Sequence, residues 1–259
     1  VGLARWLCER WHVPLLMSLG DYALACLWAV PGQGDAVLGG TGGEAAALHF
    51  ARHGLVDAEA QAQIKQRSSY YSELVYRLPG HYHRLLHNDE LRIGGRVWRC
   101  IVGYGHAPEH MALYSENLGV LIAGDMVLPT ISTNVSVFAY EPESDPLTLY
   151  LDSLKLYLEL SEDTVVLPSH GRPFQGLHTR IHYLQNHHEE RLVETLDACK
   201  QPQGCSAAEL VPVLFKRQLD MHQLTFAMGE ALAHLHRLYF QGRLKRHVNA
   251  EGIYKFYAI

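Results

Sequence analysis

Short β-rich segments, separated by tight turns and followed by amphipathic helices, are the feature that most constrains how this chain folds. We expect strands at 90–93, 96–102, 111–115, 120–122 and 164–167. Turn residues such as Gly94-Gly95 separate them, which is typical of strands rather than helices. Apolar residues recur at helical spacing over 146–160 and 177–196. Strands that alternate with helices predict an α/β fold in which helices cover the sheet.

The N-terminal part of the chain is predicted to be mostly helical. We expect helices at 3–11, 21–29, 44–53 and 57–76, with one strand at 13–17. Asp57 is a suitable N-cap for the last of these helices, and Pro79-Gly80 ends it. The glycine-rich run 39–43 lacks the Gly-Lys-Ser/Thr ending of a phosphate-binding loop, so we interpret it as a turn and helix cap.

Composition excludes some classes of protein. The chain has 259 residues, is 48% hydrophobic and carries a net charge of −5, which argues against a protein that coats nucleic acid or an acidic membrane. No stretch approaches the roughly 20 apolar residues of a spanning helix, and no signal peptide is visible. The five cysteines are odd in number and show no CxxC spacing, so we expect free thiols and a cytoplasmic protein.

Three short turns each place a metal-competent side chain at the end of a predicted strand. They are Gly105-His106-Ala107-Pro108-Glu109-His110, Gly124-Asp125 and Pro168-Ser169-His170-Gly171. Glycine lets the backbone approach an ion closely, and proline stiffens the turn that holds the ligand. Two imidazoles and one carboxylate form a ligand set that suits zinc, or else manganese or iron(II). We therefore expect His106, Asp125 and His170 to converge on one metal centre.

The order of these motifs, GHxPxH, then GD, then PxHG, resembles the later half of the metallo-β-lactamase superfamily signature. The resemblance implies an αββα sandwich with two divalent ions, zinc above all, at the edge of its sheets. It implies that His106 is a ligand of the first metal and His170 a ligand of the second. Asp125 would bridge both metals and act as the catalytic carboxylate, while His110 resembles a structural histidine of the same turn.

The superfamily's leading motif, His-x-His-x-Asp-His, does not occur in this sequence. Val1-Gly2 and the helix expected after them resemble the residues that follow that motif. We therefore expect the sequence to begin just after the motif, so that the fold lacks its first strands. A natural pseudoenzyme and a divergent start are the other interpretations. With only part of the family's ligand set, the chain from Val1 is expected to bind metal weakly.

Two further groups of histidines are weaker candidates for a metal site. His81-Tyr82-His83 has the spacing of two metal ligands, but no aspartate stands two residues on, and it follows a predicted helix instead of a strand. His187-His188 is followed by the charged residues 189–191. We expect neither group to bind metal, and we expect the second pair on a solvated helix face.

A change in composition after Cys199 marks a second region. We expect helices at 207–215 and 222–241 and a hairpin-like end at 244–258. This outline resembles a winged-helix domain found in one branch of the superfamily, so we divide the chain into a hydrolase-like domain at 1–188 and a winged-helix domain at 189–259. The long helix carries little positive charge, which favours a role in shaping the active-site rim over docking nucleic acid.

The resemblance implies a hydrolase in which a hydroxide bound by two metals cleaves a small ester, thioester or lactone. One alternative is a nuclease of the same superfamily, which a basic groove from 243–246 to the metal centre would favour. The other is a non-catalytic winged-helix regulator with a degenerate hydrolase domain, which widely separated ligands would favour. Asn134, Tyr104 and His110 are candidates for the substrate pocket. The expected partner is a small molecule, not a membrane.

Overall fold

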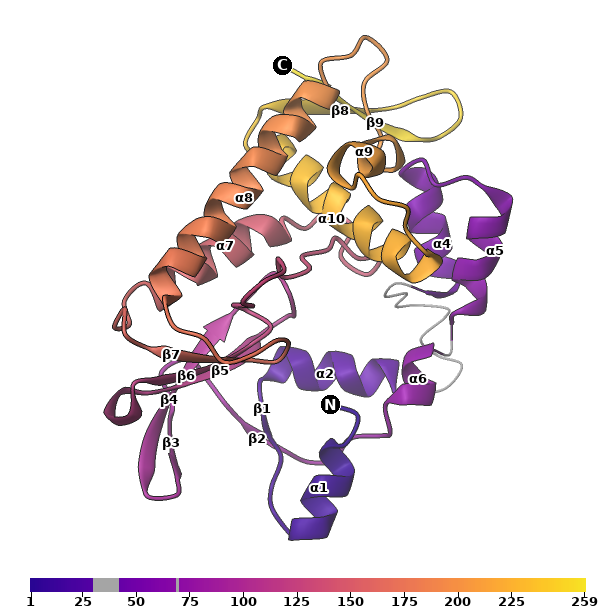
Figure 1. Ribbon diagram of the computed structural model, residues 1–259. Helices are drawn as coiled ribbons and strands as arrows, with labels where there is room; N and C mark the ends of the chain where they lie inside the picture. Colours follow the sequence, from indigo (N-terminus) through magenta and orange to yellow (C-terminus); the bar gives the residue numbers. More distant parts are fainter. Residues whose placement is uncertain (30–41, 69) are drawn as a thin grey trace.

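The computed structural model describes residues 1–29, 42–68 and 70–259 (Figure 1). Its central element is a five-stranded sheet in the order β3-β4-β5-β6-β7. The strands are β3 (Glu90–Ile93), β4 (Arg96–Gly103), β5 (His110–Ser115), β6 (Val120–Gly124) and β7 (Val165–Pro168). The strand predictions are therefore confirmed to within two residues at each end. Most of the glycine-rich run at 39–43 lies outside the described residues.

The direction of the strands decides where the functional turns meet. Strands β3 to β6 are antiparallel to their neighbours, whereas β7 runs parallel to β6. A parallel pair needs a long crossover, which α7 (Pro146–Tyr157) supplies. Because β6 and β7 run the same way, their carboxyl ends share one edge of the sheet, and the turn between β4 and β5 lies at that edge too.

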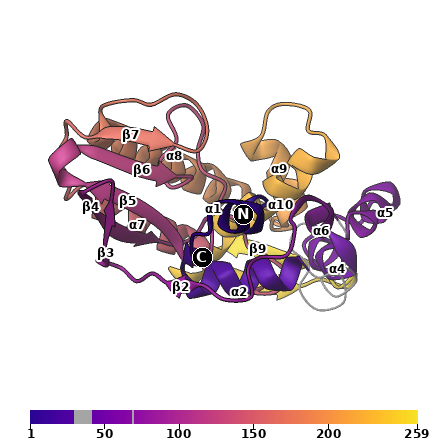
Figure 2. The same cartoon turned by 90° about the horizontal axis from the view of Figure 1, so that it is seen from below.

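Helices α7 and α8 (Leu177–Ala198) form the layer that covers one face of this sheet (Figure 2). Helix α10 (Met221–Phe240) packs against both of them. Side chains alternate along β6, so Leu121 and Ala123 are buried while Ile122 is partly exposed on the other face. Buried residues of the sheet and of all three helices form one hydrophobic cluster. Tyr150 lies fully buried within it, and its hydroxyl donates to the carbonyl of Met126 at 3.1 Å.

The N-terminal region consists of short elements. They are α1 (Ala4–Trp11), β1 (Leu16–Met17), α2 (Leu19–Trp28), α4 (Gly43–Arg52), α5 (Ala58–Gln66), α6 (Tyr70–Leu74) and β2 (His83–Arg84). Strand β1 pairs in parallel with β2, so that Leu16 lies opposite His83. The prediction that 81–83 simply follows a helix is therefore incomplete, because His83 begins a strand. Both His81 and His83 are exposed.

The prediction of one long helix over 57–76 is wrong. Asp57 does cap a helix, since its side chain accepts from the N–H of Ala60 at 2.8 Å, but α5 ends at Gln66 and α6 is a separate short helix. Serine and aromatic residues, which fill 68–71, are weaker helix formers than the Ala, Gln and Glu that precede them. The spacing of apolar residues over 57–76 did not reveal this fall in helix propensity at 68–71.

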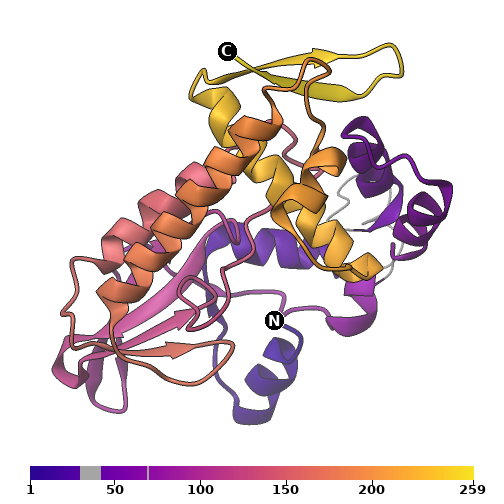
Figure 3. The ribbon, with the colours of Figure 1, turned by 45° about the horizontal axis from the view of Figure 1, so that its top comes forward.

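The C-terminal region contains the predicted series of elements. Helix α9 (Ala207–Leu214) and α10 precede a hairpin of β8 (Leu244–Val248) and β9 (Tyr254–Ala258), which lies at the top of Figure 3. On α10, Leu232, Leu235 and Leu238 are fully buried, as expected for a packing helix. Helix α8 continues without a break across the predicted domain boundary at 188/189, and the winged-helix assignment stays a prediction.

The prediction that His187-His188 lies on a solvated helix face is wrong for His188. His188 is fully buried, and its Nδ1 lies 3.2 Å from Nε2 of His234 on α10. The reason is helical spacing: His188 falls on the same stripe as Leu184 and Leu192, which packs inward, while the charged neighbours face solvent. Burial, followed by the nearby charge of His234, lowers the pKa of His188 to about 2.

Replacing His188 with leucine will reduce the sensitivity of the fold to acid. The folded-state pKa lies below the unfolded value of 6.5, so His188 is protonated only on unfolding, and its contribution to stability is lost as pH falls below 6.5. Between pH 7 and pH 5 the free energy of unfolding should fall by about 2 kcal/mol less in His188→Leu than in the parent protein. Urea unfolding at both pH values measures this, with the exposed His182→Leu on the same helix as control. Equal pH dependence in all three proteins would contradict it.

Candidate metal centre

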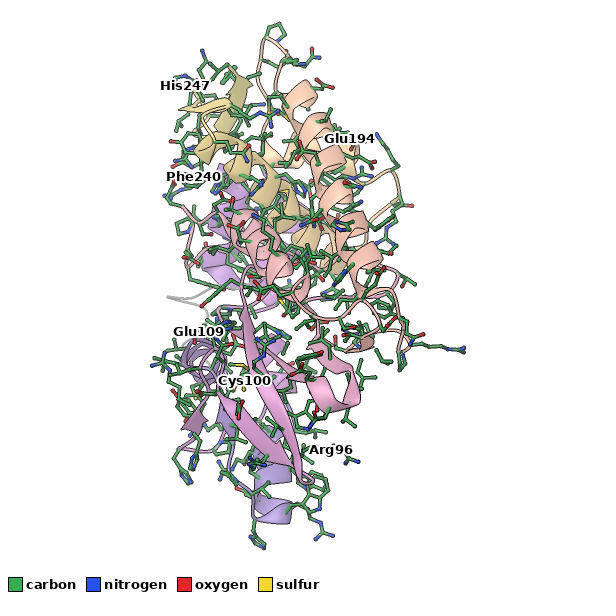
Figure 4. All side chains as sticks on the ribbon, turned by 90° about the vertical axis from the view of Figure 1, so that its left-hand side faces the viewer. Arg96, Cys100, Glu109, Glu194, Phe240 and His247 are labelled. Atoms are coloured by element: carbon green, nitrogen blue, oxygen red, sulfur yellow. The ribbon has the colours of Figure 1, made fainter. Side chains whose placement is uncertain are left out.

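The three strand-end turns meet at the carboxylate of Asp125. His106 lies in the turn between β4 and β5, Asp125 follows β6 directly, and His170 stands two residues beyond β7. Oδ2 of Asp125 lies 3.4 Å from Nε2 of His106, and Oδ1 lies 3.5 Å from Nε2 of His170. Each carboxylate oxygen therefore faces a different imidazole. Figure 4 shows Glu109, from the same turn as His106, at the opposite end of β4 from Arg96.

Two glycines allow the backbone to form this edge. Gly105 has φ of +92°, and a Cβ there would lie 2.4 Å from the carbonyl oxygen of Pro146. Gly124 has φ of +53°, and a Cβ there would lie 2.3 Å from Nε2 of His110. Neither position has room for a side chain, and both need a backbone conformation that glycine adopts readily. The glycines of the sequence motifs are thus required by close packing around Asp125.

His106 is held in the orientation of a metal ligand. Its Nδ1 donates to the backbone carbonyl of Asn134 at 2.8 Å, which leaves Nε2 unprotonated in the neutral ring and directed at Asp125. Metal-binding histidines commonly use their other nitrogen in this way. Burial alone would lower the pKa of His106, but its bonds to Asp125 and Asn134 outweigh burial, so the pKa is raised.

Asp125 is ionised at neutral pH. The hydrogen bond that His106 donates when its ring is protonated, together with one from Ser169, outweighs burial and holds the pKa of Asp125 far below its usual range. The backbone around it is also fixed, because the hydroxyl of Thr133 donates to the Asp125 carbonyl at 2.5 Å. An ionised carboxylate held by hydrogen bonds between two imidazoles is suited to bind cations.

Ser169 is a site residue that the sequence analysis did not single out. Its hydroxyl donates to Oδ1 of Asp125, and its N–H donates to the carbonyl of Gly124 at 3.0 Å. These two bonds join the turn after β7 to the end of β6. The only sequence signal was its position inside the motif Pro168-Ser169-His170-Gly171, between a stiff residue and the histidine.

Ser169→Ala should weaken metal binding without unfolding the protein. Residues that hydrogen-bond to metal ligands commonly affect metal affinity by about 10- to 100-fold, and we expect the affinity for Zn²⁺ to fall within that range. The matched control is Ser161→Ala, which removes an exposed serine hydroxyl from the loop before β7. Zinc titrations and unfolding midpoints of both variants give the comparison. Parental zinc affinity in Ser169→Ala would show that the bond to Asp125 has no role in metal binding.

His110 stands behind Asp125 and does not line the neighbouring pocket. Its Nε2 accepts the N–H of Asp125 at 3.3 Å, so this nitrogen is occupied by the backbone. Burial, followed by the charge of His106, lowers the pKa of His110 to about 4, which keeps the ring neutral. The structure therefore places His110 against the backbone of Asp125 and not in the lining of that pocket, and its role stays a prediction.

The other two pocket candidates occupy different places. Tyr104 is 41% exposed and lines a pocket of about 250 Å³ beside His106. The side-chain oxygen of Asn134 accepts from the hydroxyl of Ser136 at 2.8 Å, and its backbone oxygen holds His106. Asn134 thus supports the loop and the imidazole, whereas Tyr104 borders the space where a ligand could bind.

A pair of acidic residues fixes the turn that carries His106. The N–H of Gly20 in α2 donates to Oε2 of Glu109 at 2.9 Å, and the N–H of Glu109 donates to Oδ1 of Asp21 at 3.1 Å. The carboxylate of Glu109 also lies at the N-terminus of α2, where negative charge is favourable. Burial is the main cause that raises the pKa of Asp21. No motif predicted this link, since its partners are almost 90 residues apart.

The donors present fit a pair of divalent ions better than a single one. Among the described residues, no three His, Cys, Asp or Glu side chains surround one ion position. Instead, each oxygen of Asp125 shares its surroundings with one imidazole, His106 or His170. This arrangement offers two donors to each of two positions, and nitrogen and carboxylate donors suit zinc, manganese or iron. A four-coordinate ion would need further ligands at each position.

The chain belongs to the metallo-β-lactamase superfamily. The model of that superfamily matches residues 1–170, and the model described as "Metallo-beta-lactamase-like, C-terminal domain" matches residues 192–259. Proteins of the superfamily typically bind divalent metals. The structure therefore has an α/β metallo-β-lactamase fold followed by a C-terminal domain. No helix in the described part of the chain is long and apolar enough to cross a bilayer.

Two solved structures are similar over the whole chain. A β-lactamase domain protein from Burkholderia ambifaria is 50% identical with a TM-score of 0.90, and this chain covers 71% of it. A metallo-β-lactamase family protein from Thermus thermophilus is 28% identical with a TM-score of 0.79, and 75% of it is covered. A curated relative, "Probable metallo-hydrolase YqjP" of Bacillus subtilis (strain 168), is 27% identical over 144 residues. That match spans 53% of this chain and 43% of the relative.

Proposed function

We propose that this protein is a metal-dependent hydrolase that cleaves a small ester, thioester or lactone. The observation that carries the proposal is the position of Asp125, whose two oxygens lie 3.4 and 3.5 Å from the Nε2 atoms of two different histidines. His106, Asp125 and His170 would hold a pair of divalent ions, zinc in the first place and manganese or iron otherwise. A four-coordinate ion at either position would need ligands in addition to these three residues.

The protein's own residues would prepare the reaction in three ways. Asp125 stays ionised and keeps its orientation through Ser169 and Thr133. The bond to Asn134 holds Nε2 of His106 toward the centre. Tyr104 borders the adjoining pocket, where it would limit the approach of substrate and water. When bound, divalent ions at such a site lower the pKa of water toward neutrality and stabilise negative charge that develops on oxygen.

The two alternative functions have less support in the structure. A nuclease would need free basic groups between the C-terminal hairpin and the metal centre, but the guanidinium of Arg246 is bonded to Glu143 at 2.9 Å and stacks on Tyr239 and Tyr254. A degenerate regulator would be expected to let its ligands drift apart by more than about 8 Å, since zinc–ligand bonds are only about 2 Å long. His106 and His170 instead both lie close to Asp125.

The proposal is tested by assaying the protein, as its gene encodes it, on small thioesters, esters and lactones before and after chelation. Thioester or ester hydrolysis should disappear with EDTA and return when Zn²⁺ or Mn²⁺ is added back. Single-stranded RNA and DNA serve as the second set of substrates. A rate of hydrolysis that EDTA does not change would refute metal dependence. Cleavage of the nucleic acids alone would favour a nuclease.

A further inference from the structure

A small aromatic pocket opens directly beside His106. Its volume is about 250 Å³, which is less than the roughly 300–1,000 Å³ of sites that hold a whole ligand. It is therefore sized for one part of a substrate. The residues that line it include Tyr104, His106, Phe138, Tyr140, Glu141 and Leu149.

One wall of the pocket consists of stacked aromatic rings. Phe138 and Tyr140 lie with their ring centroids 5.3 Å apart at an angle of 10°. Trp28 meets both rings edge-on, at 6.4 Å and 5.9 Å. Phe138 and Tyr140 belong to neither hydrophobic core cluster of the described residues, and both are partly exposed. Partly exposed aromatic surface outside the core is typical of a site that binds ligand.

The segment that forms this wall is fixed by the C-terminal domain. The N–H of Val137 donates to the carbonyl of Gly229 at 3.3 Å, and Nδ1 of His236 donates to the carbonyl of Ser144 at 2.9 Å. Arg237 donates to the hydroxyl of Thr148 at 2.6 Å. The absence of a side chain at Gly229 lets the segment around Val137 approach α10, because a Cβ at Gly229 would lie 2.5 Å from the hydroxyl of Ser136. The pocket is thus preformed, which lowers the entropic cost of binding.

The charge around the pocket disfavours acidic groups. Among the described residues that line it, Glu141 is the carboxylate, and none is a lysine or an arginine. Burial is the main cause that raises the pKa of Tyr140, and negative charge from Glu141 and Asp21 raises this pKa further, so the hydroxyl stays protonated. A carboxylate or phosphate on the part of a substrate that lies inside this pocket would meet the negative charge of Glu141, without a lysine or arginine among the described lining residues to pair with it.

We propose that this pocket binds an uncharged aryl or similarly compact apolar acyl group, placing the adjoining carbonyl at the Asp125 centre. The inference rests on the proposed hydrolase function and names its substrate class. Ring-on-ring packing against Phe138 and Tyr140 supplies the affinity. The contact of His106 with both the pocket and Asp125 supplies the alignment. Specificity comes from the shape of the pocket and from the lack of a lysine or arginine among its described lining residues, which leaves an acidic acyl chain without a partner inside it.

The first test compares phenylacetyl and acetyl thioesters of N-acetylcysteamine, followed by thiol release. The parent enzyme should favour the phenylacetyl thioester in kcat/KM. Phe138→Ala should lower the ratio of kcat/KM for the phenylacetyl thioester to that for the acetyl thioester by about tenfold. The control is Phe240→Ala, which removes a 49%-exposed ring near the C-terminal hairpin, away from Glu109 (Figure 4). Leu149→Trp fills the pocket from an exposed position of α7 and should exclude phenylacetyl even if Phe138→Ala does not fold.

The second test measures binding without catalysis. Phenylacetone, which is uncharged and cannot be hydrolysed, is titrated into EDTA-treated protein by calorimetry. It should bind the parent and Phe240→Ala alike, and about tenfold more weakly to Phe138→Ala. If phenylacetone binds but the protein hydrolyses no ester or thioester, the proposed pocket stands and the proposed hydrolase function is refuted. If both thioesters are hydrolysed at equal rates and phenylacetone does not bind, the hydrolase function stands and the proposed pocket is refuted. Tighter binding of phenylacetate than of phenylacetone would overturn the exclusion of acidic groups.

Discussion

Asp125→Asn will lower kcat/KM for the best thioester or ester by about 10³-fold or more, equivalent to about 4 kcal/mol of lost transition-state stabilisation. Asparagine keeps the shape of the side chain but removes the charge that faces both His106 and His170. Metal content should fall with activity, because a neutral amide binds divalent ions more weakly than a carboxylate does. Kinetics and elemental analysis of the same preparation provide both measurements.

Asp163→Asn is the matched control for this variant. It makes the same chemical change in an exposed loop, just before β7. The control should retain parental kinetics and metal content. If Asp125→Asn also kept its metal and most of its activity, the carboxylate would be a structural residue, and the centre described above would not be the reaction site.

Gly105→Ala will destabilise the fold by about 3 kcal/mol or more, combining overpacking with backbone strain. The new Cβ would lie 2.4 Å from the carbonyl oxygen of Pro146 and 2.6 Å from Cβ of Tyr150, in a backbone with φ of +92°. Because Pro146 and Tyr150 belong to α7, the turn that carries His106 would have to move away from this helix. Urea unfolding of the variant measures the change in the free energy of unfolding.

Gly95→Ala separates the two causes of this loss. Gly95 also has a positive φ, of +77°, but a Cβ there meets nothing within 4 Å. We expect this control to lose only about 1 kcal/mol, from backbone strain alone. Similar losses in the two variants would show that close packing against α7 contributes little at Gly105.

Much of the fold and of the centre could be predicted because the signals are local. The alternation of side chains and the flanking turn glycines predict the bounds of β3 to within a residue. Gly105 and Gly124 directly precede His106 and Asp125 in the sequence, and both have a positive φ. Parallel and antiparallel neighbours then bring strand ends to one edge, which is why His106 and His170 reach Asp125 across long stretches of sequence. The roles of these residues in binding metal stay predictions.

The features that were missed depend on tertiary contacts. Burial of His188 follows from the packing of α10 on α8, which the flanking charges did not suggest. The link between Gly20, Glu109 and Asp21 joins distant segments with no shared motif. The pocket wall at Phe138 depends on contacts with the C-terminal domain that sequence periodicity cannot encode.

A crystal structure of the protein grown with Mn²⁺, with anomalous maps recorded at the manganese edge, examines the centre most directly. The account predicts two peaks about 3.5–4 Å apart, one on each side of the Asp125 carboxylate, with Nε2 of His106 on one ion and Nε2 of His170 on the other. Peaks that avoid Asp125, or histidine side chains that turn away from the ions, would contradict it.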